Sequence, residues 1–228
     1  MAIALVGSQA VKGIATAVTL TLTLPSNPAT GGISFIVVVV ASSALTTSTV
    51  ASTNDTFTRA IRVQDSLIVD YVDIWYAAGI VGGANSRSIV VTPSASASMA
   101  GWAWEFSGVA TTSALDGSGS SSTSSLSPGS VTPSVANELW ISGALNSTNA
   151  LTAPTGWTDG GNLNPVGIVQ ADGGYFIQSG SGAINPTWQG TANEPCSAMA
   201  SFKPVVVVPS YFTRRPPSFV PPNRAASW

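Results

Sequence analysis

The stretch Ser98-Met-Ala-Gly-Trp-Ala-Trp-Glu-Phe-Ser-Gly108 decides the fold. Read with the period of two of a β-strand, it separates a large aromatic face from a face of mostly small side chains. The first face carries Ala100, Trp102, Trp104 and Phe106, and the second carries Met99, Gly101, Ala103 and Glu105. Each large ring can bury about 150–250 Å². We therefore expect an interior strand of a β-sandwich, with a second backbone or a packed sheet close to its small face.

The rest of the chain repeats short strand patterns between turn residues. Residues 16–24 alternate with Leu20, Leu22 and Leu24 on one face. Residues 33–41 are apolar apart from Ser34, as expected of a strand covered on both faces. Further strands are expected over 56–63, 67–78, 88–92, 138–145 and 196–202, with shorter ones near 156–158, 166–170, 175–178 and 187–189. Residues 113–130 are almost entirely Ser, Gly and Thr and predict an exposed loop. Many short strands without a helical period predict an all-β, antiparallel β-sandwich or jelly roll.

Composition changes sharply near residue 203. We expect an N-terminal arm or edge strand over 1–14, a β-sandwich domain over 15–203 and a Pro-rich C-terminal arm over 204–228. The last segment holds six of the fifteen prolines and three arginines without an acid, which gives it a net charge of +3, whereas residues 1–203 carry −5. Such a segment is expected to be extended and polyproline-like, with aromatic anchors for a partner.

The charge, the apolar runs and the single cysteine argue against nucleic-acid binding, a membrane span and an internal disulfide. Only 8% of residues are charged, against about 25% in ordinary soluble proteins, so little repulsion keeps copies apart and residence in an assembly is favoured. Three arginines are too few for a nucleic-acid footprint. The longest apolar run is too short and too β-branched for a membrane span. Cys196 is the only cysteine, so no internal disulfide forms, and its apolar context predicts a buried, inert thiol.

The chain offers little catalytic chemistry. It has no histidine, which removes the commonest general base and most zinc sites. Two-carboxylate catalysis would require a pair such as Glu105 and Glu138 to converge in a cleft; a structural role for Glu105 is the simpler interpretation. Asp159 and Asp172 each precede Gly-Gly and are expected in turns. No calcium loop or phosphate-binding glycine motif is present, so we expect no enzyme, no metal and no cofactor.

Tryptophans divide into two groups. Trp102, Trp104 and Trp140 lie in strand patterns and are expected in the core. Trp157 and Trp188 lie among loop residues and are the candidates for a glycan-binding surface, because flat rings cover the apolar faces of sugars.

Four segments together resemble a β-sandwich (jelly-roll-like) module of tailed-phage virion proteins and bacterial surface or secreted proteins. They are Ile74-Trp75-Tyr76-Ala77, Ala103-Trp104-Glu105-Phe106-Ser107-Gly108-Val109, Ala136-Asn137-Glu138-Leu139-Trp140 and Ala198-Met199-Ala200-Ser201-Phe202-Lys203. The resemblance covers about residues 15–203 and brings no catalytic residue with it. It implies the β-sandwich fold but no single activity. Together with the low charge, the lack of catalytic chemistry and the basic Pro-rich segment, it favours a structural protein of a phage virion, made in the host cytoplasm.

We therefore expect a head decoration (cement) or minor capsid subunit, homo-oligomeric and bound to the major capsid protein or to like subunits. The expected partner-binding residues are Val206, Val208, Tyr211, Phe212, Arg214, Arg215, Phe219, Arg224 and Trp228. Residues 205–208 would pair with the partner's strand edge. Two alternatives stay open: a carbohydrate-binding or adhesin module of a tail or surface protein, and a jelly-roll shell protein that builds the lattice itself.

Overall fold

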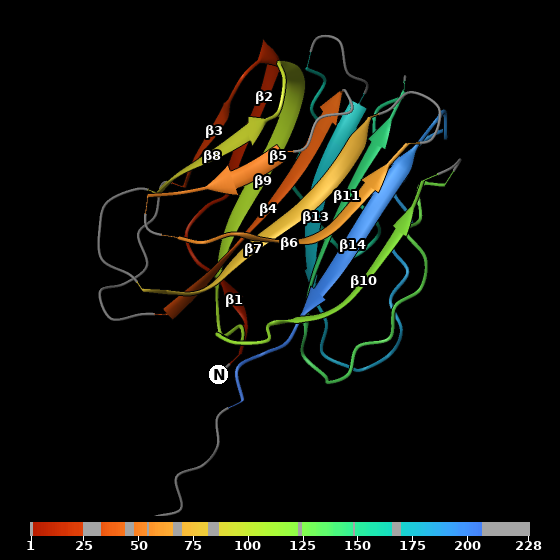
Figure 1. Cartoon of the computed structure of the whole chain (residues 1–228). Helices are drawn as coiled ribbons and strands as arrows, with labels where there is room; N and C mark the ends of the chain where they lie inside the picture. The colour runs from red at the N-terminus through yellow and green to blue at the C-terminus, as the bar shows by residue number, and fades with distance from the viewer. Residues whose placement is uncertain are drawn as a thin grey trace, which may run out of the picture.

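The computed structural model describes residues 2–24, 33–43, 48–53, 55–65, 70–81, 87–122, 125–147, 149–165 and 170–206. Within these ranges all regular secondary structure is β-strand, and every paired strand is antiparallel. Figure 1 shows the strands stacked in layers. The predicted all-β, antiparallel sandwich is thereby confirmed.

The middle layer is a six-stranded sheet around the aromatic stretch of residues 98–108. That stretch forms β9 (Ala97–Ser107), flanked on one side by β4 (Ile33–Ser43) and on the other by β1 (Ala4–Leu5) and β2 (Ala10–Ala17). The sheet continues from β4 to β7 (Tyr71–Val81) and β6 (Thr58–Gln64). β4 is buried on both faces, as the apolar run from Phe35 to Ala41 predicts.

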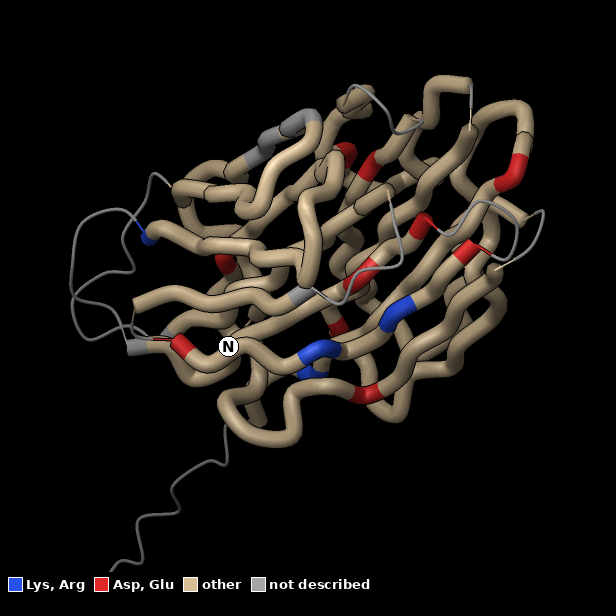
Figure 2. Tube along the Cα trace, turned by 45° about the horizontal axis from the view of Figure 1, so that its top comes forward, with Lys and Arg blue, Asp and Glu red and all other residues tan. Residues whose placement is uncertain are grey.

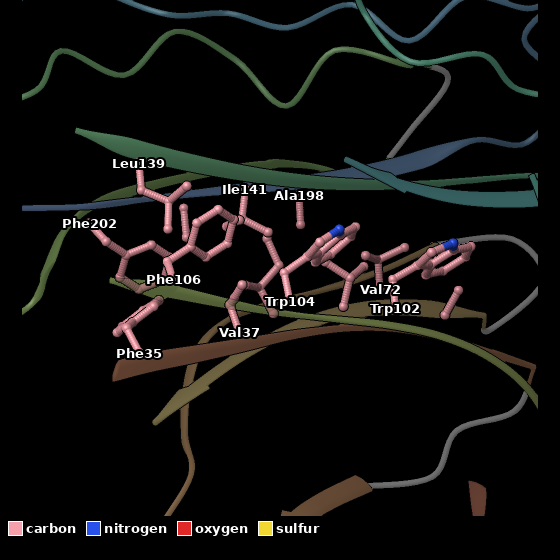
Figure 3. Packing of buried hydrophobic residues seen from close by; sticks show 14 of the residues in the cluster. Phe35, Val37, Val72, Trp102, Trp104, Phe106, Leu139, Ile141, Ala198 and Phe202 are labelled. Atoms are coloured by element: carbon pink, nitrogen blue, oxygen red, sulfur yellow. The ribbon is translucent and has the colours of Figure 1, made fainter. Parts of the chain in front are cut away.

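A five-stranded sheet covers the aromatic face of β9. Its order is β10 (Leu115–Ser121), β14 (Cys196–Phe202), β11 (Leu139–Asn146), β13 (Gln170–Ile177) and β12 (Thr158–Asp159). Trp102, Trp104 and Phe106 point from β9 into the core between the two sheets, where Ile141 and Phe202 come from the other side (Figure 3). Burial of these rings is the main hydrophobic contribution to the fold.

A three-stranded sheet covers the opposite face of the middle layer. It has the order β3 (Leu20–Leu24), β8 (Arg87–Pro93) and β5 (Ser48–Ala51). Leu20 and Leu22 come so close to Gly101 that a methyl group built on that glycine would lie 2.8 Å from Leu20 Cδ2. The close approach expected on the small face of β9 is therefore present, and it is made by a third layer.

Two segments differ from the sequence-based expectations, and a third takes one of two expected forms. Residues 115–121, expected in an exposed loop, form edge strand β10 because their backbone pairs with β14 and Gly117 and Gly119 leave room for Val131 above them. The strand expected over 16–24 is broken at Val18, whose side chain is 66% exposed, and β3 begins only at Leu20. Residues 4–5 and 10–17 form edge strands, which is one of the two forms expected for residues 1–14, and β2 continues to Ala17.

Candidate functional site

Trp157 is presented by a tight turn on the outer side of the five-stranded sheet. Its backbone N–H donates to the carbonyl of Pro154 (3.0 Å), which closes a four-residue turn. Gly156 occupies the third position with φ of +85°, the left-handed value that a type II turn requires there. The chain then enters β12, so the turn holds Trp157 rigidly at the start of an edge strand.

Phe176 lies beside Trp157 on the same face. The pairing of Thr158 with Tyr175 places the preceding residue, Trp157, next to Phe176. Tyr175 points inward, with its ring 5.1 Å from that of Phe106, so the alternation of the strand turns Phe176 outward. The rings of Trp157 and Phe176 are stacked, with centroids 5.9 Å apart and an interplanar angle of 27°. Together they form one half-buried aromatic surface.

An open groove of about 350 Å³ runs past this aromatic pair. Its volume lies at the lower end of the range for small-ligand sites, about 300–1,000 Å³. No charged residue is among the described residues that line it: Pro154, Thr155, Trp157, Phe176, Ala183, Ile184, Asn185, Pro186, Thr187 and Gln189. We call this feature the Trp157 groove. Its walls are aromatic and proline rings, and its polar groups are amides and hydroxyls, which suits a neutral ligand.

The amides of the groove are held in place by the surrounding loops. The Ser127 hydroxyl donates to Asn185 Oδ1 (2.5 Å), so the Nδ2 hydrogens of Asn185 remain available as donors. Gln189 Nε2 donates to the carbonyl of Thr187 (2.9 Å), which leaves Gln189 Oε1 as an acceptor. The groove can therefore both donate to and accept from a ligand.

Trp188 does not contribute to this surface, contrary to the sequence-based expectation. Its side chain is only 1% exposed and packs with Leu126, Ala144 and Leu151 above the five-stranded sheet. The indole N–H donates to the Ser142 hydroxyl (3.0 Å) in that buried cluster. Trp188 is a core residue because the segment around it folds back over the sheet, and Trp157 alone remains as a stacking candidate.

The expected partner-binding segment begins where the sandwich ends. Pro204 bridges to Val109, and the backbone N–H of Val205 donates to the carbonyl of Gly108 (2.8 Å). Val206 is 78% exposed, the largest exposed fraction among the described large apolar residues. Val208, Tyr211, Phe212, Arg214, Arg215, Phe219, Arg224 and Trp228 lie outside the described residues.

Glu105 and Glu138 do not form a catalytic pair. Both are fully buried, but they face different groups. Burial raises the pKa of Glu105, while Ser34 and Arg87 act in the opposite direction. Burial and the neighbouring Asp116 carboxylate raise the pKa of Glu138 to about 7. Each carboxylate therefore sits in its own structural environment.

Two buried carboxyl groups of the five-stranded sheet, Glu138 and Asp172, each lie near a second carboxylate. Beside Glu138, Asp116 accepts hydrogen bonds from the backbone N–H (2.5 Å) and hydroxyl (2.6 Å) of Ser134, and its pKa falls to about 2 although burial opposes this. Burial and then the charge of Asp159 raise the pKa of Asp172 to about 8. Asp159 accepts from the N–H of Gly161 (2.8 Å), as a turn aspartate does, whereas Asp172 lies inside β13.

Other chemistry is sparse in the described part of the chain. It contains no group of three or more His, Cys, Asp or Glu side chains arranged to hold a metal ion. Cys196 is a buried free thiol whose pKa is raised by burial. Among the same residues no helix has the length and apolar character needed to cross a membrane.

Comparison with known proteins identifies no relative. No protein-family model, no curated protein and no solved structure matches the chain.

Proposed function

We propose that this chain is a non-enzymatic structural subunit of a tailed-phage particle, a head decoration or minor capsid protein that docks on neighbouring subunits through residues 204–228. The resemblance of residues 15–203 to the virion β-sandwich module supports the class of protein. The observation that carries the docking role is the contrast between a body of net charge −5 and a Pro-rich, acid-free segment of net charge +3 that follows its last strand.

The distribution of charge in the body supports this role. Figure 2 shows charged positions as isolated patches on a tube that is otherwise uncharged. Three of the five basic residues of the body are already engaged, in the pairs Arg62–Asp73, Arg87–Asp55 and Lys203–Asp116. Six of the ten acids of the body are buried and two others belong to these pairs, so Asp159 and Glu194 are the acids that remain to meet a basic partner segment. The sparsely charged surface also provides little repulsion between copies.

The test is occupancy on the native particle. A chain that stops after Val206 keeps every described strand and the Val205–Gly108 hydrogen bond. We expect it to fold with the melting temperature of the full chain but to be absent from purified particles, as counted by quantitative mass spectrometry. A full chain with Val18→Ala, a change at an exposed site, is the matched control. Full occupancy by the shortened chain would refute the docking role.

Glycan binding is the second candidate function, and the groove beside Trp157 is the observation that favours it. Its support is weaker than the sequence suggested, because Trp188, the other expected stacking residue, is buried. A neutral oligosaccharide would be the expected ligand, since the described lining carries no charge.

A further inference from the structure

We propose that the Trp157 groove is the docking site for residues 215–222 (RPPSFVPP) of a neighbouring copy of this chain. This inference rests on the proposed docking role of residues 204–228 and adds the receptor. The prolines would lie on the Trp157–Phe176 surface, and Arg215 would reach Asp159.

The chemistry of the groove matches that of the segment. Proline-rich segments enter binding sites in a preformed polyproline II conformation, and aromatic-lined grooves are the usual receptors for them. The Trp157 groove offers the stacked rings of Trp157 and Phe176 together with the buried rings of Pro154 and Pro186. A polyproline helix has no internal hydrogen bonds, so its carbonyls need outside donors. Asn185 Nδ2, left available by the bond from Ser127 to Oδ1, is such a donor.

The charge beside the groove matches as well. Asp159 lies two residues after Trp157 in β12, so the alternation of the strand places both side chains on the same outer face. Its side chain is exposed, and no basic side chain forms a salt bridge with it among the described residues. In the sequence 214–222, two arginines directly precede the first Pro-Pro pair. An arginine at Asp159 and a proline at Trp157 would fix both the position and the direction of the segment.

The position of the segment in the chain favours exchange between copies. Phe202, the last residue of β14, and Ile177, the last of β13, both pair with Leu139, so the end of the sandwich and the groove lie at the same end of one sheet. The chain then turns toward the middle layer, where Pro204 and Val205 contact Val109 and Gly108. The groove opens on the opposite, outer face. Because the described chain ends on the side away from its own groove, we expect the following segment to enter the groove of a neighbour.

A complementation experiment with full-length chains tests this. The groove variant is Trp157→Ala, with Asp159→Asn as a second variant that leaves the aromatic surface intact; the arm variant is R215S/P217S/P221S. By analytical ultracentrifugation we expect the wild type to associate with increasing concentration, each variant alone to stay monomeric, and an equimolar mixture of Trp157→Ala and the arm variant to form a one-to-one complex. Val18→Ala, at an exposed site between β2 and β3, should associate as the wild type does.

A peptide titration provides the direct measurement. A labelled peptide of residues 204–228 should bind the arm variant, and adding Trp157→Ala should weaken binding by about 30-fold, as truncation of a central aromatic anchor does. Adding Asp159→Asn to the arm variant should remove most of the dependence of peptide affinity on salt concentration. Equal affinity with and without Trp157 would overturn the groove as receptor, while loss of particle binding by the shortened chain would still support the docking role.

Two other results would also overturn the inference. If the wild type stays monomeric and only the arm variant binds the peptide, residues 215–222 occupy the groove of their own chain. Trp157-dependent binding of neutral oligosaccharides, with no binding of the peptide, would assign the groove to a glycan.

Discussion

Replacing Gly101 by alanine tests the contact that joins β9 to the third layer. The new methyl group would lie 2.8 Å from Leu20 Cδ2 and 3.1 Å from Leu22 Cδ1. Carbon atoms in favourable contact are about 3.5–4.0 Å apart. The leucine side chains must therefore move by up to about 1 Å in a region where Leu20 and Leu22 are fully buried.

The expected cost follows from two opposing effects. Overpacking of a dense core by one methyl group costs about 1–3 kcal/mol. Alanine also restricts the unfolded chain relative to glycine, which stabilises the folded state by about 0.4–1 kcal/mol where the backbone permits it. The net expectation is a loss of about 1 kcal/mol in the free energy of unfolding, which corresponds to a fall of about 2–4 °C in the melting temperature of a chain of this size.

Urea denaturation of four chains measures this: wild type, Gly101→Ala, Leu20→Val and the double variant. Leu20→Val alone should cost about 1 kcal/mol for the methylene group that it removes. In the double variant the alanine methyl fills part of that space, so the two losses should not add, with a coupling of at least about 0.5 kcal/mol. Gly182→Ala is the control, because its nearest neighbour would lie at 3.9 Å. Additive losses would refute the packing of β3 against β9.

Three further predictions concern ionisation, the turn and the thiol. Between pH 4.5 and about 7 the folded chain retains a proton on Glu138 that the unfolded chain has lost, so the free energy of unfolding should fall as pH rises through this window. Glu138→Gln should flatten the curve of unfolding free energy against pH and leave only the slope due to Asp172. Gly156→Ala meets no atom within 4 Å but must adopt φ near +85°; it should cost about 1 kcal/mol in thermal denaturation and weaken peptide binding through the displaced Trp157. Cys196 should resist iodoacetamide in the native protein and react at once in denaturant, as mass spectrometry of the labelled chain would show.

The strands that the sequence predicts well are those whose side chains differ in size or polarity between the two faces. β9 and β4 were predicted with both of their faces, and β14 with both of its ends. β10 was missed because Leu115 is its only large apolar residue. Its pairing depends on backbone hydrogen bonds to β14 and on glycines that admit Val131, and neither leaves a periodic signal.

The candidate site was predictable only in part. Trp157, singled out because it lies among loop residues, is half-buried beside the groove, at the end of a turn that the structure closes at Pro154. Phe176 was missed, although the inward position of Tyr175 would have indicated that its neighbour points outward. The burial of Trp188 could not be predicted, because it depends on how a long loop folds over the sheet and brings its indole to Ser142.

The core also shows how a chain with so few charges can fix its strand register. Gly173 of β13 faces β9, and a methyl group there would lie 3.1 Å from both Trp102 and Trp104. A slip of β13 by one residue would turn its apolar set outward. A slip by two would keep the faces but bring Tyr175 toward the place of Gly173, against the indoles. The same reasoning applies to Gly143, where a methyl group would lie 2.5 Å from Val39. The close contacts at these glycines therefore exclude shifted registers of the strands. In a more charged protein, repulsion between like charges on paired strands could do the same.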